Sequence, residues 1–166
     1  MKKFISILIA LLISSSPLWA APERVSRPAT KSDLVGVWDM VSVRPVSDKT
    51  DPVFFPHQKF QFRPDSSLKV MVSDKAFSKE SIDKFQKMPA AIDYSIDEKG
   101  VLTMTWQNRP HSETAVCAYV MKDIPVEMTA KLTSEQRAQL PKKGDVTLSF
   151  LNNGKITYQK VLTRAA

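Results

Sequence analysis

The sequence predicts an all-β protein, a closed antiparallel up-and-down barrel of about eight strands with one or two short helices in its connections. Three observations lead to this prediction. Short runs of alternating apolar and polar residues recur between residues 34 and 164. Turn-forming residues separate the runs at close intervals, as is typical of hairpins. An open sheet of this size would expose two strand edges, and closure into a barrel removes them.

The first 20 residues predict a secretory signal peptide. Two lysines stand within residues 1–3, an apolar run covers residues 4–13, and small residues with one proline lead to Ala20. The apolar run is shorter than the roughly 20 residues of a membrane-spanning helix, so a cleaved peptide is a better interpretation than an anchor. We therefore expect export to a bacterial periplasm or secretion, with no membrane span left after cleavage.

The rest of the chain predicts one domain. Residues 21–33 contain two prolines and mixed charges and are expected to be a flexible lead-in, followed by a single barrel domain over residues 34–164. The net charge of +7 becomes +5 when Lys2 and Lys3 leave with the signal peptide. Basic residues are scattered rather than gathered in the stripe typical of nucleic-acid binding, so we expect no nucleic-acid partner.

The first half of the domain contains a strand, a hairpin and an insert. The first strand is predicted over residues 37–44, followed by a proline-rich loop over 45–58. Phe60 and Phe62 begin a hairpin that turns at 64–67 and returns through Leu68, Val70 and Val72.

Residues 74–89 interrupt the alternation and predict a short helix. Asp74 or Ser78 could cap it, and Pro89 would end it. Its apolar side would carry Ile82, Phe85 and Met88.

Alternation resumes in the second half. A hairpin is predicted from residues 92–96 and 102–106, and a further strand over 115–121. Residues 126–132 could extend that strand or pair with it. Thr133 and Gln136 have the spacing of a capping box, which predicts a short helix to Leu140. The last hairpin joins 146–150 to 156–162 through Asn152-Asn153-Gly154, residues that tolerate the positive φ of a tight turn.

The apolar face of these strands is expected to point inward. The predicted strands are shorter than the roughly 9–11 residues that a membrane-spanning strand needs. The sequence therefore predicts a barrel with an apolar interior and a solvent-exposed outer surface.

Three features carry a resemblance to a known family. Gly36-Val37-Trp38 opens the first strand, a ladder of hairpins follows, and Arg164 stands just past the last strand. With these features the chain resembles the lipocalin-like, or calycin, β-barrels over residues 34–164, and among them the small bacterial domains. The resemblance implies that Trp38 plugs the closed end of the barrel and that Arg164 packs across it through a cation–π contact, with Gly36 beside them. In that family the first loop lies over the open end, so Phe54 and Phe55 of the 45–58 loop could form a lid. Equally, the two aromatic side chains could anchor a long loop.

An eight-stranded barrel either fills its interior with side chains or holds one small ligand, and the sequence allows both. In the second case the wall would combine aromatic rings, adaptable methionines and tyrosine hydroxyls. The candidate ligand-binding residues are Met40, Phe54, Phe55, Phe62, Tyr94, Met104, Trp106, Tyr119 and Tyr158.

The sequence predicts no catalytic residues, metal or cofactor, and thus a protein that is not an enzyme. Cys117 is the single cysteine and lies in an apolar run, which indicates a buried, inert thiol without an intramolecular disulfide. His57 and His111 have no partner at metal-ligand spacing. The four glycines form no phosphate-binding loop.

Two functions remain as hypotheses. In the first, the barrel binds or sequesters a small hydrophobic or amphipathic molecule in the envelope. In the second, the barrel is a filled interaction module that presents the 74–89 insert and the 45–58 loop to an envelope protein, because both segments are richer in apolar side chains than connections usually are. The sequence leaves the oligomeric state open.

Overall fold

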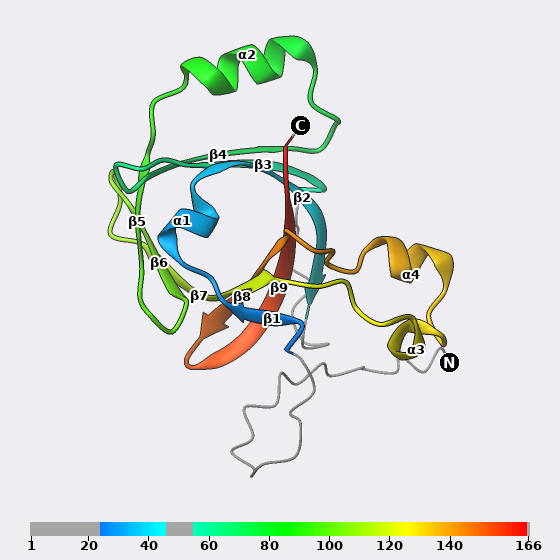
Figure 1. The fold of residues 1–166 in the computed structure, drawn as a ribbon. Helices are drawn as coiled ribbons and strands as arrows, with labels where there is room; N and C mark the ends of the chain where they lie inside the picture. Colours follow the sequence, from blue (N-terminus) through cyan, green and yellow to red (C-terminus); the bar gives the residue numbers. More distant parts are fainter. Residues whose placement is uncertain (1–23, 46–54, 166) are drawn as a thin grey trace.

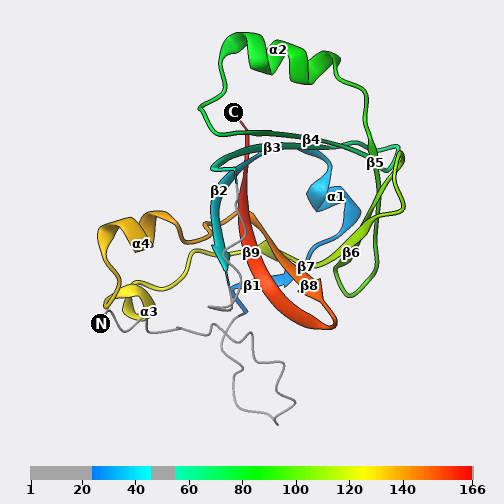
Figure 2. The same ribbon diagram turned by 180° about the vertical axis from the view of Figure 1, so that it is seen from behind.

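The structure, a computed structural model, describes residues 24–45 and 55–165. In these residues it forms a closed antiparallel barrel of eight strands with one additional strand and four short helices (Figures 1 and 2). The strands are β1 (Ser26–Pro28), β2 (Gly36–Pro45), β3 (His57–Phe62), β4 (Ser67–Ser73), β5 (Ile92–Ile96), β6 (Val101–Trp106), β7 (Ser112–Val120), β8 (Val146–Asn152) and β9 (Lys155–Arg164). The helices are α1 (Lys31–Leu34), α2 (Lys79–Lys87), α3 (Val126–Thr129) and α4 (Ser134–Ala138).

The barrel closes between its first and last strands. Each strand from β2 to β9 pairs with the next along the chain, and β2 pairs in turn with β9. That seam runs from Trp38 opposite Arg164 to Pro45 opposite Tyr158, with a bulge after Met40. The predicted fold class is confirmed, and the architecture is compatible with a lipocalin-like fold.

The predicted hairpins are also confirmed. The β3–β4 pair places Phe60 opposite Val70, and the β5–β6 pair places Tyr94 opposite Met104. In the β8–β9 turn, Asn153 and Gly154 have φ angles of 50° and 74°. The turn thus uses the left-handed conformations that Asn and Gly favour.

The described part of the predicted lead-in, residues 24–33, contains a strand and most of a short helix. Strand β1 pairs with residues 118–120 of β7, past Val116, which is the last β7 residue that pairs with β6. Helix α1 follows β1 along the chain. Arg27 and Asp33 join the two elements through a bidentate ion pair at 2.7 and 2.8 Å. Three strand residues ending in proline carry no readable alternation, and a four-residue helix shows no periodicity. Long-range pairing with β7 places the strand, and a local capping box between Thr30 and Asp33 begins the helix.

A helix, not a strand, follows β7. Val126 and Met128 are 73% and 65% exposed in α3, so neither has a sheet face to cover. Pro125 precedes the helix, and the strand prediction for residues 126–132 is wrong there. The predicted capping box of α4 is present: Thr133 accepts from the Gln136 amide, and the Gln136 side chain accepts from Thr133.

The insert forms the predicted helix, α2, which lies across the outer face of β3 and β4 (Figures 1 and 2). Ser78 caps it by accepting a hydrogen bond from the Ser81 amide at 3.2 Å. Phe85 is buried, and Lys69 of β4 donates to the carbonyls of Phe85 and Gln86 at the end of the helix. A cation at this end also complements the helix dipole.

One end of the barrel is closed by α1 and Trp38. The Trp38 side chain is fully buried, and its indole Nε1 donates to the Leu34 carbonyl at 2.6 Å. The Arg164 guanidinium lies 4.6 Å from the Trp38 ring and donates to the carbonyls of Val35 and Asp33. The cation–π contact implied by the resemblance is therefore present.

Gly36 makes this closure possible. Its φ of 138° is one that other residues rarely adopt, and a Cβ at this position would collide with the Arg164 guanidinium. The glycine thus lets the arginine lie flat against the strand and cover the indole.

No helix in the described part of the chain has both the length and the apolar character to cross a membrane.

Candidate functional site

The closed half of the barrel interior is packed with apolar side chains. Phe62 and Tyr94 meet edge to face with their ring centroids 5.1 Å apart, and the Tyr94 hydroxyl donates to the Arg63 carbonyl at 2.8 Å. The fully buried side chains around them include Trp38, Leu68, Leu102, Leu148 and Leu162. In this half the interior is a core.

The other half contains polar side chains that point inward, which we call the polar cluster: Gln58, Glu113 and Lys160. Strand register places them. Lys160 pairs with Leu148, and Glu113 pairs with Met104, both of which belong to the core. Gln58 lies on the same face of β3 as Phe60. This half lies at the end of the barrel away from Trp38, where Pro45 of β2 pairs with Tyr158 of β9, and we call it the open half or open end.

The amine of Lys160 lies among rings inside the barrel. Its Nζ is 2.8 Å from the Gln58 side-chain oxygen, to which it donates. Ring centroids of Phe150, Phe60 and Tyr158 lie 5.0, 5.4 and 5.7 Å away. Phe150 and Tyr158 stack on each other with centroids 4.4 Å apart. The rings stabilise the ammonium through cation–π contacts, which are stronger when water is excluded.

Burial shifts the titration of this group. It lowers the pKa of Lys160 from 10.5 to about 8, while the charge of Glu113 acts in the opposite direction. Burial also raises the pKa of Tyr158, and Glu113 adds to that shift. Near neutral pH this half therefore holds a mostly charged amine and a phenol that stays protonated.

Trp106 and His111 lie at the rim beside the polar cluster. Their rings are 4.8 Å apart, and His111 Nε2 lies 3.3 Å from a Glu113 carboxylate oxygen. The Arg109 guanidinium covers the Trp106 ring at 5.3 Å. Trp106 is only half-buried against the core, so an aromatic surface and charged groups meet at the open end.

The structure divides the predicted ligand-binding residues between the two halves. Phe62, Tyr94 and Met104 are buried core residues. Trp106 and Tyr158 are half-buried at the open end, whereas Tyr119 lies beside Arg27 of β1, 4.9 Å from its guanidinium. Three further members stand apart: Met40 at the β2 bulge, Phe55 with 45% exposure, and Phe54 outside the described residues.

The polar cluster was missed by sequence reasoning, although a signal for it exists. Gln58 precedes Phe60 by two positions, Glu113 precedes Ala115 by two, and Lys160 lies between Tyr158 and Leu162. Each residue therefore occupies an inward position of an alternating strand. The candidate list was drawn from apolar and aromatic residues of the inward face, and it therefore left out these three polar residues.

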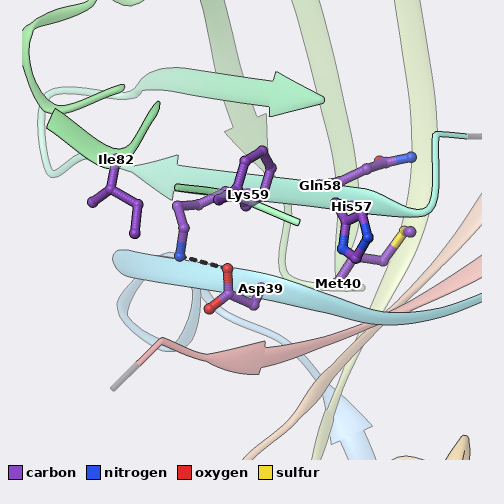
Figure 3. Close-up of a pocket in the computed structure, with 7 residues that line it drawn as sticks. Asp39, Met40, His57, Gln58, Lys59 and Ile82 are labelled. Atoms are coloured by element: carbon purple, nitrogen blue, oxygen red, sulfur yellow. Dashed lines mark ion pairs between the residues drawn. The ribbon is translucent and has the colours of Figure 1, made fainter. Parts of the chain in front are cut away.

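A second feature lies outside the barrel, beneath the insert. A hollow of about 300 Å³ is lined by Asp39, Met40, His57, Gln58, Lys59, Phe77 and Ile82. Figure 3 shows Lys59 reaching the Asp39 carboxylate on the neighbouring strand, with Ile82 of α2 above them. Phe77 meets the His57 ring edge to face at 6.2 Å. Gln58 connects the two sites, because it also binds Lys160.

Cys117 and the metal-ligating residue types of the described chain do not contribute to these two sites as a nucleophile or a metal centre. Cys117 is buried in the core, and burial raises its pKa, so it is a poor nucleophile. Residues 24–45 and 55–165 contain no group of three His, Cys, Asp or Glu side chains placed to hold a metal. Comparisons with protein-family models, curated proteins and solved structures gave no match.

Proposed function

We propose that this chain is an exported, lipocalin-like carrier that binds one small amphipathic molecule in the open half of its barrel. The observation that carries the proposal is the polar cluster, a lysine, a glutamate and a glutamine on inward positions of an otherwise apolar interior. The sequence of residues 1–20 supports export.

The energetic argument starts from the cost of burial. Moving an ammonium group out of water is unfavourable, and its cation–π and hydrogen-bond partners offset that cost only in part, as the lowered pKa of Lys160 indicates. In the closed half, leucines such as Leu68, Leu102 and Leu162 fill the interior without this desolvation cost. Ionisable groups kept in a partly enclosed site at the expense of stability are typical of binding sites.

The arrangement favours a ligand with an apolar body and one polar group. Trp106 and Tyr158 offer aromatic surface at the open end, and Lys160 with Gln58 offers a donor and an acceptor deeper inside. A fully apolar ligand would add no hydrogen bond to those that Lys160 and Gln58 already make, whereas the polar group of an amphipathic ligand would add one, so the polar cluster favours the amphipathic ligand.

Fluorescence titration tests the proposal. We expect alkyl alcohols and alkyl carboxylates of about ten carbons to change the tryptophan emission of natively purified protein in a saturable way, since ligand sites of ~300 Å³ and above accept molecules of this size. The Trp106→Phe variant should lose most of the signal but keep binding measured by calorimetry. Absence of heat and of a fluorescence change across the panel would reject a carrier.

A second function is favoured by the hollow beneath α2. Phe85 fixes the helix to the wall, yet Ile82 stays 36% exposed and forms part of the lining with Phe77. In this proposal the insert is the contact surface for an envelope protein. Cross-linking followed by pull-down with Ile82→Asp and, as a matched control, Asp83→Asn on the exposed side of the same helix would test it. Equal recovery of partners by both variants would reject it.

A further inference from the structure

Residues 121–145, which join β7 to β8 and which we call the α3–α4 segment, are fixed to the barrel wall. Figures 1 and 2 show this segment standing out beside β2 and β9, on a different side of the barrel from α2. The Arg44 side chain in β2 donates to the Gln139 carbonyl at 3.1 Å. The Lys143 amide donates to the Asp123 carboxylate at 2.8 Å, which joins the two ends of the segment. The segment therefore presents its surface from a defined position.

The α3–α4 segment contains a hollow of about 290 Å³, separate from the barrel interior and from the hollow beneath α2. Its lining combines apolar, basic and acidic residues, namely Ile124, Leu140, Pro141, Arg137, Lys142 and Asp123. Neither Arg137 nor Lys142 forms an ion pair with a residue that the structure describes, whereas the Asp123 carboxylate is already held by the Lys143 amide. An apolar lining with two available cations suits an anionic group attached to an apolar body.

Two apolar side chains of α3 are left in water beside this hollow. Val126 and Met128 are 73% and 65% exposed, the two highest values among the large apolar side chains of the described residues. Thr129, the last residue of the same helix, lines the hollow. Neighbouring apolar side chains that are surrounded by polar groups are typical of surfaces that contact a membrane or another protein.

We propose that the α3–α4 segment docks the protein on a membrane surface that contains anionic phospholipid. Val126 and Met128 enter the boundary between head groups and acyl chains. One phospholipid head group occupies the hollow, with its phosphate between Arg137 and Lys142. The segment lies outside the barrel, so this docking is independent of ligand binding in the open half.

The charge and the extent of the segment favour a lipid surface over a protein partner. Residues 136–144 contain three basic and no acidic residues, and a basic side chain near an anionic bilayer is attracted without a fixed geometry. A stable protein interface would bury a larger connected apolar core than two side chains supply. Glu127 and Glu135 oppose the attraction, so we expect docking that is reversible and sensitive to salt.

Co-sedimentation with vesicles tests the inference on the wild-type protein. Natively purified protein is mixed with vesicles of phosphatidylcholine, alone or with about one-third phosphatidylglycerol. We expect at least about tenfold tighter binding to the anionic vesicles, and a loss of about tenfold when salt rises from about 50 to about 500 mM. Equal binding to both kinds of vesicle, or binding to neither, would overturn the inference. Mass spectrometry checks that all samples share one N-terminus, because the apolar run of residues 4–13 would bind lipid by itself.

A pair of double variants separates a defined head-group site from attraction by net charge. Arg137→Gln with Lys142→Gln should weaken binding to anionic vesicles about tenfold, because it removes both cations of the hollow. Lys79→Gln with Lys87→Gln, at the two ends of α2, removes the same charge from another side of the molecule and should weaken binding less than about twofold. Equal losses from the two double variants would overturn a site on the α3–α4 segment.

A polarity-sensitive thiol dye measures the insertion of α3. Cys117 is the only cysteine of the chain and is buried, so Met128→Cys can be labelled selectively, and Gln86→Cys on the exposed part of α2 is a control with the same dye. With anionic vesicles the emission at position 128 should shift to the blue, while that at position 86 stays unchanged. No shift at position 128, or equal shifts at both, would overturn the inference. A shift at position 128 that lipid-free envelope protein causes and vesicles do not would assign the segment to a protein partner instead.

Discussion

Both ends of the barrel combine aromatic rings with a cation, but the arrangement differs between them. At the closed end the Arg164 guanidinium covers Trp38 from outside and satisfies two carbonyls, while the indole is fully buried. At the open end the cation, Lys160, lies inside and the rings surround it. A cation kept at the surface costs little desolvation, whereas one placed inside costs more. The closed end is thus arranged for stability, and the open end retains a group that stability does not require.

The largest expected effect comes from removing the plug. Trp38→Ala should lower the free energy of unfolding by about 3–5 kcal/mol, because it empties a large volume in a packed core. Trp106→Ala at the open end should cost less than about 2 kcal/mol, since its half-buried ring leaves no enclosed cavity. Urea denaturation followed by circular dichroism measures both. Equal losses would contradict the division of the barrel into two unlike halves.

Gly36→Ala tests the backbone side of the same closure. The new Cβ would meet the Arg164 guanidinium, and the φ of 138° is unfavourable for alanine. We expect a loss of about 1–3 kcal/mol in unfolding free energy. Gly154→Ala is a matched control, because its φ of 74° is also positive but a Cβ there meets no atom within 4 Å. If both variants lost the same stability, displacement of Arg164 would contribute nothing.

Replacing the interior cation should stabilise the protein, in contrast to the two preceding variants. We expect Lys160→Met to raise the unfolding free energy by about 0–2 kcal/mol at pH 7, because it exchanges a desolvated charge for a similarly shaped apolar chain. The same variant should bind amphipathic alcohols more weakly. A stabilised protein with weakened binding is typical of a residue retained for function. A large loss of stability would instead assign Lys160 to the structure.

The pH dependence of the difference between wild type and Lys160→Met follows from the lowered pKa. The unfolded chain has a lysine pKa near the ordinary 10.5, whereas the folded one is about 8. Between these values the unfolded state binds more protons, so stability rises with pH. The deficit of the wild type relative to the variant should therefore be full below pH 8 and shrink as the pH rises towards 10. Denaturation at pH 7 and pH 9.5 measures it, and an unchanged difference would contradict an interior amine.

The sequence predicted most of the barrel, because each hairpin carries its own alternation and turn residues. Trp38 and Arg164 could be paired in advance by resemblance, although residues 126 apart share no local signal. By contrast, β1 and α1 are held by long-range contacts, with β7 and with Arg164, that no short window contains. The polar cluster was missed for a different reason. Its members stand at regular inward positions, and only the assumption that an inward residue is apolar removed Lys160 from the candidates.

The smallest expected effect concerns the ion pair that holds β1 to α1 at the closed end. The Arg27 guanidinium, followed by the hydrogen bonds from Thr30, lowers the pKa of Asp33 from 3.8 to about 2. A carboxylate whose pKa is lowered in the folded state stabilises the protein at pH values above its unfolded pKa, and that contribution is lost as the pH falls from about 4 to about 2.

The variant Asp33→Asn tests this contribution. Because Arg27 is partly exposed, solvent screening limits the effect, and we expect Asp33→Asn to cost about 1 kcal/mol of unfolding free energy at pH 7 and almost nothing at pH 2. Glu80→Gln, in the exposed pair with Lys84, is the control and should change stability by less than about 0.5 kcal/mol at either pH. Urea denaturation at the two pH values decides the matter: if Asp33→Asn behaved like Glu80→Gln, the short first strand would owe its position to its backbone pairing with β7 alone.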